Sequence, residues 1–353
     1  MEDARIKFLQ QLVETPSPSG FEAPVQALVR ADLKQHAAEV KTDVLGNVVG
    51  ILNPAGSPRI MLAGHCDEVG LLVRHINDEG YIYFAPIGGV NNFMLVGHRI
   101  IIHNAAGPCI GVVCWSRPHG KGGDNANKLP DLYDMWIDIG ARNKEEALKR
   151  VAIGDPVTFA AGFERLGEDF ANSPGFDDKM GVFIILEAFR MVAEKSTKAA
   201  VFAVSTVQEE LGWFGAMTSA FDLKPDAAIA VDVGGTGDIP GSDKTRSGDV
   251  GLGKGPILYR GPAFNPVLAG LLIETAKTNE IPYQMRAQGG GTGTDITTIQ
   301  VSRAGVATAV VSVAMRFGHG PFSILSLSDL EHSARLLAAL ICRLEPDLSF
   351  IPG

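Results

Sequence analysis

The stretch AAVFAVSTV at residues 199–207 runs directly into QEELG at residues 208–212. The apolar run predicts a fully buried strand that ends in a glycine-containing turn. Glu209 and Glu210 then stand at the mouth of that strand, where an unpaired buried charge would cost several kcal/mol unless a cation met it. Adjacent side chains on an extended backbone point to opposite faces, so one carboxylate can bind a metal ion while its neighbour handles the proton of a metal-bound water. The alternative is that both glutamates simply begin a solvated loop.

The composition is that of a globular protein without an affinity for nucleic acid or membrane. The chain has 353 residues, of which 46% are hydrophobic, and this length suggests roughly two domains. Its net charge of −9, without a cluster of Lys and Arg, argues against nucleic acid as a partner and suits a site that attracts cations or amines. The longest apolar segments are interrupted by polar residues or are too short to span a bilayer.

The cysteines and the first residues predict a cytoplasmic protein. Cys66, Cys109, Cys114 and Cys342 form neither a CxxC pair nor a dense disulfide pattern, so we expect reduced thiols. The start MEDARIKFLQQ is charged and amphipathic and lacks the apolar core of a secretory signal.

Helix-like and strand-like patterns alternate along much of the chain. Residues 3–14 carry apolar side chains at helical spacing, and Ser19 with Glu22 forms a capping-box pattern before a second amphipathic helix. We expect further strands at residues 47–52, 59–63, 199–207, 227–231 and 304–314, and further helices at residues 179–195, 266–277 (capped by Asn265) and 329–344 (opened by Ser328 and Glu331). Such alternation predicts an α/β sandwich with a largely parallel sheet, helices on both faces and a site at the carboxyl ends of the strands.

The segment from residue 69 to about residue 163 differs in character. Short strand patterns at residues 71–73, 81–84, 99–102 and 110–114 are separated by glycine-containing turns, which suggests a small barrel or sandwich. We therefore divide the chain into a first catalytic part (1–68), an inserted barrel-like domain (69–163) and a second catalytic part (164–353). The loop at residues 117–129 is the best candidate for a mobile segment. Little in the insertion looks catalytic, because its histidines lack a matching set of acidic residues.

Five residues outside the insertion share one local context, the end of an apolar strand or loop followed by glycine or a turn. They are His65, Asp177, Glu210, Asp232 and His319. Two neutral imidazoles and three carboxylates suit two divalent ions of zinc or cobalt type, and two ions about 3.5–4 Å apart need one shared carboxylate. Asp67 lies two residues from His65 on the same strand face and is placed to orient that imidazole, while Glu209 remains free for proton transfer. Taken alone, each histidine could instead be an ordinary hydrogen-bonding residue, Asp232 could cap a loop and Asp177 could cap the following helix; all five at such junctions favour the metal site.

These residues also carry a family resemblance. The motifs H-x-D-E-x-G at 65–70, D-D-K-x-G at 177–181, V-Q-E-E-x-G at 207–212, V-D at 231–232 and R-F-G-H at 316–319 resemble those of the tetrahedral dodecameric aminopeptidases, dinuclear metallopeptidases that include glutamyl and deblocking aminopeptidases. The resemblance extends from TPSPSGFE at residues 15–22 to the final helix, and it includes the Gly-rich loop at residues 289–295, which in the family lies near the substrate. Lys179 stands where the family usually has arginine, and Gly320-Pro321-Phe322 replace the more usual serine and nearby acid.

The resemblance implies a three-layer αβα sandwich of zinc-exopeptidase type. It implies that His65, Asp177 and Asp232 hold one metal ion and that Asp177, Glu210 and His319 hold the other, with Asp177 bridging. It further implies a cis peptide bond after Asp177, and a barrel-like domain that helps to assemble dimers and then a hollow dodecamer.

The expected activity is hydrolysis of the first peptide bond of short peptides. The metal ions would polarise the scissile carbonyl and lower the pKa of a bridging water, which Glu209 would deprotonate before passing the proton to the leaving amine.

Three alternatives remain. An endoglucanase would need two opposed carboxyl groups about 5–9 Å apart and no metal pair, which fits adjacent glutamates beside two histidines poorly. A metal-dependent deacylase or amidohydrolase is closer chemically, although its insertion usually follows the acidic ligands, whereas here the long gap separates His65 from Asp177. A shell protein without chemistry would lack part of the ligand set, and none of it is missing.

Overall fold

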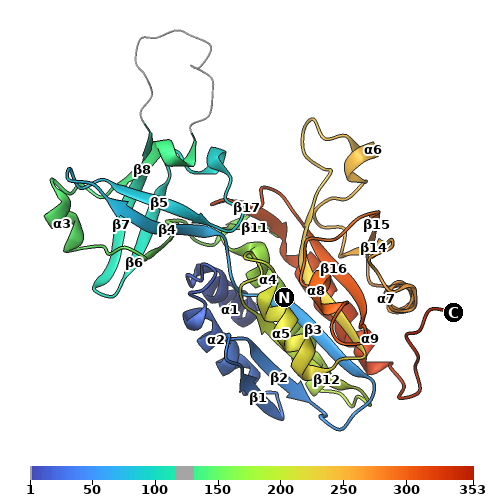
Figure 1. Cartoon of the computed structure of the whole chain (residues 1–353). Coiled ribbons are helices and arrows are strands. Elements are labelled where there is room, and N and C mark those ends of the chain that lie inside the picture. The colour runs from blue at the N-terminus through green and yellow to red at the C-terminus, as the bar shows by residue number, and fades with distance from the viewer. Residues whose placement is uncertain (1, 116–130) are drawn as a thin grey trace.

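The computed structural model describes residues 2–115 and 131–353. The chain folds into an α/β part and a small β-barrel that projects from it (Figure 1). The loop at residues 117–129, predicted to be mobile, lies outside the described residues. Within the described ranges, no helix has the combination of length and hydrophobicity that a bilayer crossing requires.

The α/β part is built on an eight-stranded sheet. In spatial order its strands are β1 (Glu39–Thr42), β2 (Val48–Leu52), β12 (Ala200–Thr206), β3 (Arg59–His65), β13 (Ala227–Gly235), β16 (Ala307–Met315), β14 (Ile257–Arg260) and β15 (Gln284–Ala287). The four central strands β12, β3, β13 and β16 are parallel, whereas β2 runs antiparallel to β12 and β14 runs antiparallel to β16. The sheet is therefore parallel at its centre, as predicted, and mixed toward its edges.

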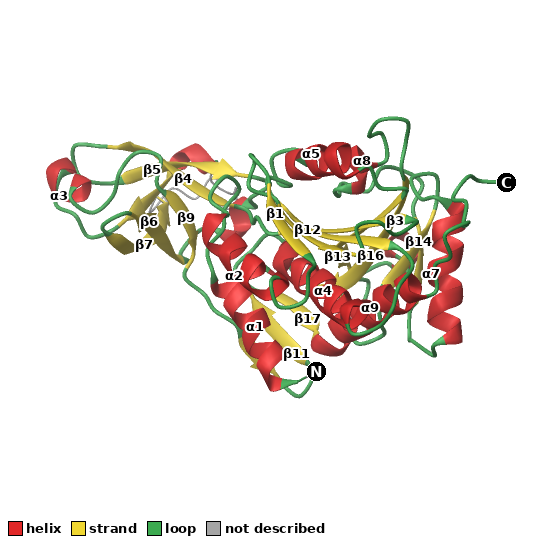
Figure 2. Cartoon of the chain, turned by 90° about the horizontal axis from the view of Figure 1, so that it is seen from below, coloured by secondary structure: helices red, strands yellow, loops and turns green. Residues whose placement is uncertain are grey.

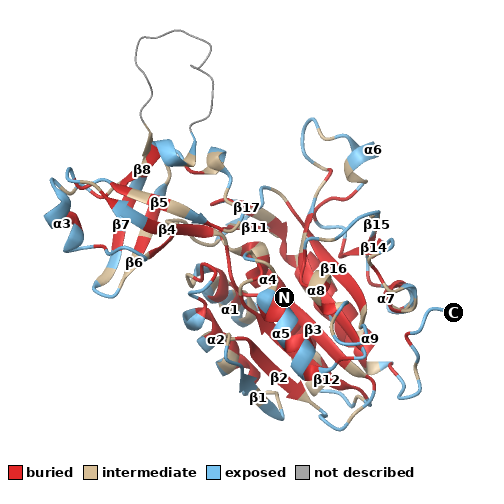
Figure 3. Cartoon of the chain, viewed as in Figure 1, coloured by how far each residue is buried: buried red, intermediate tan, exposed pale blue. Residues whose placement is uncertain are grey.

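Helices cover both faces of this sheet, which confirms the expected three-layer αβα sandwich (Figure 2). On one face lie α1 (Asp3–Glu14), α2 (Ala23–Leu33), α4 (Phe176–Ala193), α7 (Pro266–Thr278) and α9 (Leu327–Cys342), and on the other lie α5 (Phe214–Leu223) and α8 (Ile296–Ile299). Every residue of β12 is buried, because a central strand between two helical layers has no face toward water. Figure 3 shows the same burial along the central strands.

The barrel has its own hydrophobic core. Its strands close in the order β4 (Gly70–Ile76), β5 (Ile82–Ile87), β8 (Met135–Asp138), β7 (Gly107–Trp115), β6 (Arg99–Asn104) and β9 (Pro156–Phe159), with η1 (Asn92–Met94), η2 (Leu132–Asp134) and α3 (Lys144–Leu148) in the connections. Its interior is filled by side chains that alternate along these strands, among them Leu71, Val73, Ile82, Phe84 and Ile100. The predicted barrel is confirmed, and closure leaves it without open strand edges.

Elements with weak sequence patterns complete the α/β part. A three-stranded sheet joins β10 (Glu164–Leu166), β11 (Phe170–Ser173) and β17 (Ser323–Ser326), and α6 (Lys244–Ser247) lies in the connection after β13. These short strands and the four-residue helices were not predicted, since segments of three to five residues show too little periodicity.

Two of the predicted helix caps were wrong. The Ser19 hydroxyl does not cap α2; it donates to the carboxylate of Asp67 at 2.6 Å, a stronger acceptor because it is charged. Helix α9 begins at Leu327, and its N-cap is Ser326, whose hydroxyl oxygen accepts from the amide of Asp329 at 3.3 Å. Ser328, the predicted opener, instead donates its hydroxyl to Asp169 at 2.9 Å. In both cases the serine predicted to cap a helix instead donates its hydroxyl to an aspartate that is distant in sequence.

Candidate metal centre

The carboxyl ends of the four parallel strands meet at one edge of the sheet, and the predicted ligands converge there. His65 ends β3, Glu209 and Glu210 follow β12, Asp232 lies in β13, His319 follows β16, and Asp177 comes from the first turn of α4. Parallel strands bring together residues that lie far apart in sequence, because all their carboxyl ends face the same way. All seven residues predicted for the site, Asp67 included, lie in or beside this centre.

Asp177 lies between the two imidazoles. Its Oδ1 is 3.3 Å from Nε2 of His65, and its Oδ2 is 3.3 Å from Nε2 of His319. The backbone leaves helical geometry at Asp177, with φ −85° and ψ 104°, and the Asp177–Asp178 peptide bond is cis, as the family resemblance implies. One carboxylate thus faces both histidines, which is the arrangement that a bridging ligand requires.

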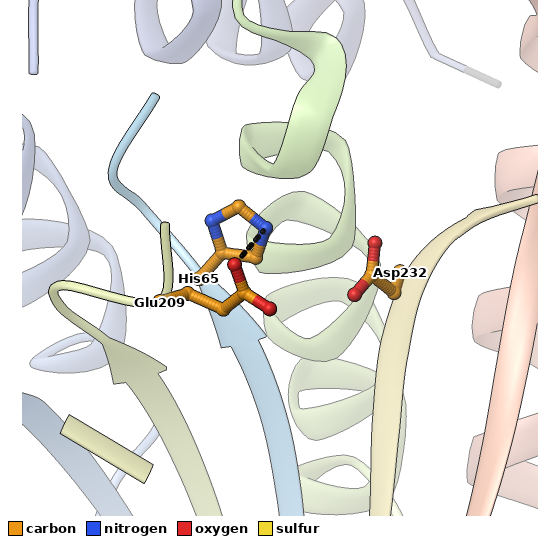
Figure 4. Close-up of side chains that lie close together, drawn as sticks. All are labelled: His65, Glu209 and Asp232. Carbon is orange, nitrogen blue, oxygen red and sulfur yellow. Dashed lines mark ion pairs between the residues drawn. The ribbon is translucent and has the colours of Figure 1, made fainter. Parts of the chain in front are cut away.

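The remaining side chains form two groups around this carboxylate. His65, Glu209 and Asp232 each offer a ligand atom, and these atoms lie within 4.8 Å of one another (Figure 4). Asp177, Glu210 and His319 form a second such group. Nε2 of His319 lies 3.5 Å from Oε1 of Glu210, and Nε2 of His65 lies 3.9 Å from Oε2 of Glu209.

Asp67 organises the centre through more contacts than the sequence suggested. Nδ1 of His65 lies 3.1 Å from the backbone carbonyl oxygen of Asp67 and 3.5 Å from its carboxylate, so the carbonyl is the nearer partner of the imidazole. The carboxylate accepts the backbone amides of Glu209 at 3.0 Å and Glu210 at 3.1 Å, together with the Ser19 hydroxyl. This buried group therefore ties the end of β3 to the turn after β12 and fixes both glutamates.

The charges in the centre shift one another's protonation. Burial disfavours the charged form of Asp177, but hydrogen bonds from His319 and His65 outweigh it and hold the pKa of that carboxyl well below its usual range. Burial raises the pKa of Glu209 to about 8, and burial together with the charge of Asp177 raises the pKa of Asp232 well above its usual value. The hydrogen bond with Asp177 raises the pKa of His319 to about 9. Titratable groups whose pKa values are shifted in opposite directions within one cluster are typical of a functional site.

The donor set fits two divalent metal ions. Imidazole nitrogen and carboxylate oxygen are ligands that zinc and related ions accept, and three or four of them are needed for each ion. Each group offers one imidazole and two carboxylates, and Asp177 directs one carboxylate oxygen at each of the two histidines. The carboxylates are largely buried, with 11% of the Asp177 side chain and 8% of the Glu210 side chain exposed, and a cation would offset the cost of burying their charge.

Two supporting pairs were not predicted. Nζ of Lys179 lies 2.7 Å from Oε1 of Glu68, with both side chains almost fully buried, and Glu68 lines a small cavity together with Asp177, Glu210 and His319. The Thr206 hydroxyl donates to Oδ2 of Asp295 at 2.7 Å, and burial raises the pKa of Asp295 to about 6. All four residues lie in or beside the motifs quoted above, yet neither pairing has a sequence signal, because the partners are far apart along the chain.

Comparison with known proteins places this geometry in a family. The model of the M42 glutamyl aminopeptidases matches residues 46–336. The lysyl aminopeptidase of Pyrococcus furiosus is 36% identical over 350 residues, which cover 98% of this chain and 99% of that protein.

Solved structures of peptidases are similar to this chain over nearly its whole length. A TET aminopeptidase from a marine sediment archaeon of the Thaumarchaeota superposes with a TM-score of 0.93 at 35% identity, covering 97% of both chains. The TET1 peptidase of Pyrococcus horikoshii, which can assemble into a tetrahedron or a large octahedral shell, superposes with a TM-score of 0.86 at 31% identity, covering 96% of this chain and all of that one (100%). The resemblance read from the motifs is thereby confirmed: the chain belongs to the M42 glutamyl aminopeptidase family and is a peptidase.

Proposed function

We propose that this protein is a metal-dependent aminopeptidase that removes N-terminal residues from short peptides, with Glu209 as its general base. The observation that carries the proposal is the placement of the Asp177 carboxylate, which presents one oxygen at 3.3 Å to each of two histidines. Carboxylates and imidazoles surround it at the carboxyl ends of the central strands, the position at which open α/β sheets bind their ligands.

We assign the ligands to two ions of zinc or cobalt type. His65, Asp177 and Asp232 would hold the first ion, and Asp177, Glu210 and His319 would hold the second. Glu209 also lies within the first group, but its oxygen is 3.9 Å from Nε2 of His65, whereas that of Asp177 is 3.3 Å away. A carboxyl with a pKa raised to about 8 suits a group that accepts and releases a proton near neutral pH.

Both proton transfers of the reaction are assigned to a residue of this chain, Glu209. When bound, the two cations supply Lewis-acid polarisation of the scissile carbonyl and make water a better nucleophile at neutral pH. Glu209 accepts a proton from the attacking water as the bond from oxygen to the carbonyl carbon forms. It then donates that proton to the peptide nitrogen as the C–N bond breaks, so that the products are a free amino acid and a shortened peptide.

A cavity beside the centre offers room for the first residue of a substrate. Its volume is about 360 Å³, and it is lined by Gly89, Asn91, Asp177, Val233, Gly234, Gly235, Met315, Gly318 and His319. Small and apolar side chains dominate this wall apart from the two proposed ligands. This supports entry of a peptide terminus rather than of a bulky folded protein.

We further propose that the chain assembles through dimers into a tetrahedral dodecamer, with residues 69–163 as an assembly domain. Relatives that form closed shells support self-association of this chain, and the separate core of the barrel supports an independent domain. Light scattering should then give twelve times the 37.4 kDa mass of one chain. We place the enzyme in the cytoplasm, where its four unpaired cysteines would stay reduced.

The experiment that tests the activity uses metal-free protein reloaded with zinc or with cobalt and a panel of aminoacyl chromogenic substrates. We expect turnover to return with metal and to fall by about 10²–10⁴-fold in Glu209→Gln, while the metal content of that variant stays at two ions per chain. Glu274→Gln, at an exposed glutamate of α7, serves as the control and should keep wild-type rates. Full activity in Glu209→Gln would contradict the assignment of the base. Release of sugar from a glucan without metal would favour the glycosidase alternative, and cleavage of N-acyl amino acids alone would favour the deacylase.

A further inference from the structure

The two histidines of the centre are oriented by different parts of the molecule. The partner of Nδ1 of His65 is Asp67, within the same α/β part, and only 3% of the His65 side chain is exposed. Nδ1 of His319 instead donates to the backbone carbonyl oxygen of Gly89 at 2.9 Å. Gly89 follows strand β5 and therefore belongs to the barrel.

This contact determines which nitrogen of His319 is available to a metal ion. A carbonyl oxygen can only accept, so Nδ1 carries the proton of the neutral ring and Nε2 keeps its lone pair. Nε2 is the atom that faces Asp177 at 3.3 Å and Glu210 at 3.5 Å. The barrel thus fixes both the tautomer and the direction of the ring.

His319 lies in a loop and is less enclosed than His65. Its backbone has φ +57°, in the left-handed region that residues other than glycine seldom adopt, and 39% of its side chain is exposed. His65, by contrast, ends a buried strand.

Two glycines allow the barrel to come this close. A Cβ on Gly89 would lie 3.2 Å from Nδ1 of His319. A Cβ on Gly88 would lie 3.0 Å from Cγ1 of Val69 and 3.1 Å from both Cβ and Oε2 of Glu210, and Gly88 also has φ +71°. The pair therefore lies beside both ligands of the second ion other than the shared Asp177, with no room for a larger residue.

The residues after His319 also pack against the barrel. A Cβ on Gly320 would lie 3.3 Å from Cγ and Sδ of Met94 in η1, and the ring of Phe322 lies 5.5 Å from the ring of His98. Gly320 and Phe322 belong to the Gly-Pro-Phe sequence that departs from the usual family pattern. Here these residues pack on the inserted domain, which supplies the surroundings of the second site.

We propose that Gly88 and Gly89 are positioning residues of the second metal site, so that the barrel is a structural component of the active centre. The ligands of both sites come from the α/β part, but only the second site has an imidazole that is oriented by the barrel. This proposal rests on the two-metal assignment made above, which it extends to the inserted domain.

The test is titration of the metal-free, full-length protein with zinc alone, followed by calorimetry and by metal analysis after dialysis. Wild type should show two binding events. In Gly88→Ala and Gly89→Ala we expect the second event to weaken by about 10–100-fold, the loss typical when a group supporting a metal ligand is disturbed, while the first stays within about twofold of wild type. Dialysis should then leave about one ion per chain.

Controls separate positioning from general damage. Gly140→Ala is matched to Gly88→Ala, since it lies in the barrel at φ +72° and its new Cβ would meet nothing within 4 Å. It should keep both binding events. If Gly88→Ala does not fold, as thermal melting would reveal, Gly89→Ala still decides the matter, because its new methyl meets only the imidazole edge.

The outcomes distinguish this proposal from the one on which it rests. Two unchanged binding events in both folded variants, or equal weakening of both events, would overturn the role of the barrel and leave the two-metal centre intact. A wild-type protein that binds fewer than two ions would overturn the assignment of the centre itself.

Discussion

Nζ of Lys179 lies 2.7 Å from Oε1 of Glu68, with 0% of the lysine side chain and 9% of the glutamate side chain exposed. The ammonium group also donates to the carbonyl oxygen of Thr15 at 2.7 Å, and Oε1 of Glu68 also accepts the amide of Ser17 at 2.8 Å. The pair thus joins the segment before α2, the segment after β3 and the first turn of α4. Lysine therefore supplies the cation of a buried ion pair at this position.

Replacing this lysine should strongly destabilise the fold. Lys179→Met leaves the Glu68 charge buried without its partner, and we expect a loss of about 3–5 kcal/mol in the free energy of unfolding. Denaturant unfolding measures it. Lys149→Met breaks an exposed pair with Glu145 and should cost under about 1 kcal/mol. If Lys179→Met and Lys149→Met lost the same free energy of unfolding, the buried pair would contribute no more to stability than the exposed one.

Asp67 should matter for both activity and metal binding. Asp67→Asn keeps the size of the side chain, but it places an NH2 group where the carboxylate accepts the amides of Glu209 and Glu210. We expect a fall of at least about tenfold in kcat/KM and a comparable weakening of zinc binding. Ser19→Ala removes only one donor to the same carboxylate and should have the smaller effect. Wild-type kinetics in Asp67→Asn would show that the carboxylate does not hold the two glutamates in place.

The ion pair between Arg316 and Asp238 should make stability depend on pH in the acid range. Nε and Nη2 of Arg316 lie 3.0 Å and 2.8 Å from the two carboxylate oxygens of Asp238. Burial opposes ionisation of Asp238, but these bonds outweigh it and hold its pKa below the usual value. A carboxyl with a lowered folded-state pKa contributes stability above its unfolded pKa, and this contribution disappears as the pH falls through the folded-state value.

Asp238→Asn should therefore melt below wild type at pH 6, and the gap should narrow below about pH 4. Because a quarter of each side chain is exposed, we expect a difference of only about 0.5–1 kcal/mol at pH 6. Melting curves of both proteins at the two pH values measure it, with the exposed Asp222→Asn as control. A gap that stayed constant with pH would mean that the pair adds no charge-dependent stability.

Metal ions should stabilise the folded chain, and less so in acid. Zinc at 100 times its dissociation constant should add about 2.7 kcal/mol, because binding to the folded state alone shifts the unfolding equilibrium. The rise in melting temperature on adding zinc to chelator-treated protein should shrink from pH 8 to pH 6, since protons compete with metal for the histidines. The double variant His65→Ala/His319→Ala should show no rise. An equal rise in that variant would indicate zinc bound elsewhere.

The sequence alone determined the architecture and the chemical type of the centre. Continuous apolar runs such as β12 indicate central strands covered on both faces, and the short glycine-separated strands of residues 69–163 indicate a barrel or a sandwich, because periodicity is a local property of the chain; the structure shows that these strands close into a barrel. The recurrence of His65, Asp177, Glu210, Asp232 and His319 at such junctions was likewise sufficient to suggest a metal site, although each residue alone has ordinary alternative roles.

Only the tertiary structure decided how those residues are supported. Ser19 donates to Asp67 instead of capping a helix. The backbone carbonyl of Asp67, rather than its carboxylate, is the nearer partner of His65, and the carbonyl of Gly89 in the barrel is the partner of His319. These contacts join residues up to some two hundred and thirty positions apart and often use backbone atoms, which every residue carries. The sequence does not indicate which backbone group will bind a given side chain, because all residues share the same backbone groups. The packing of the barrel against the α/β part decides it.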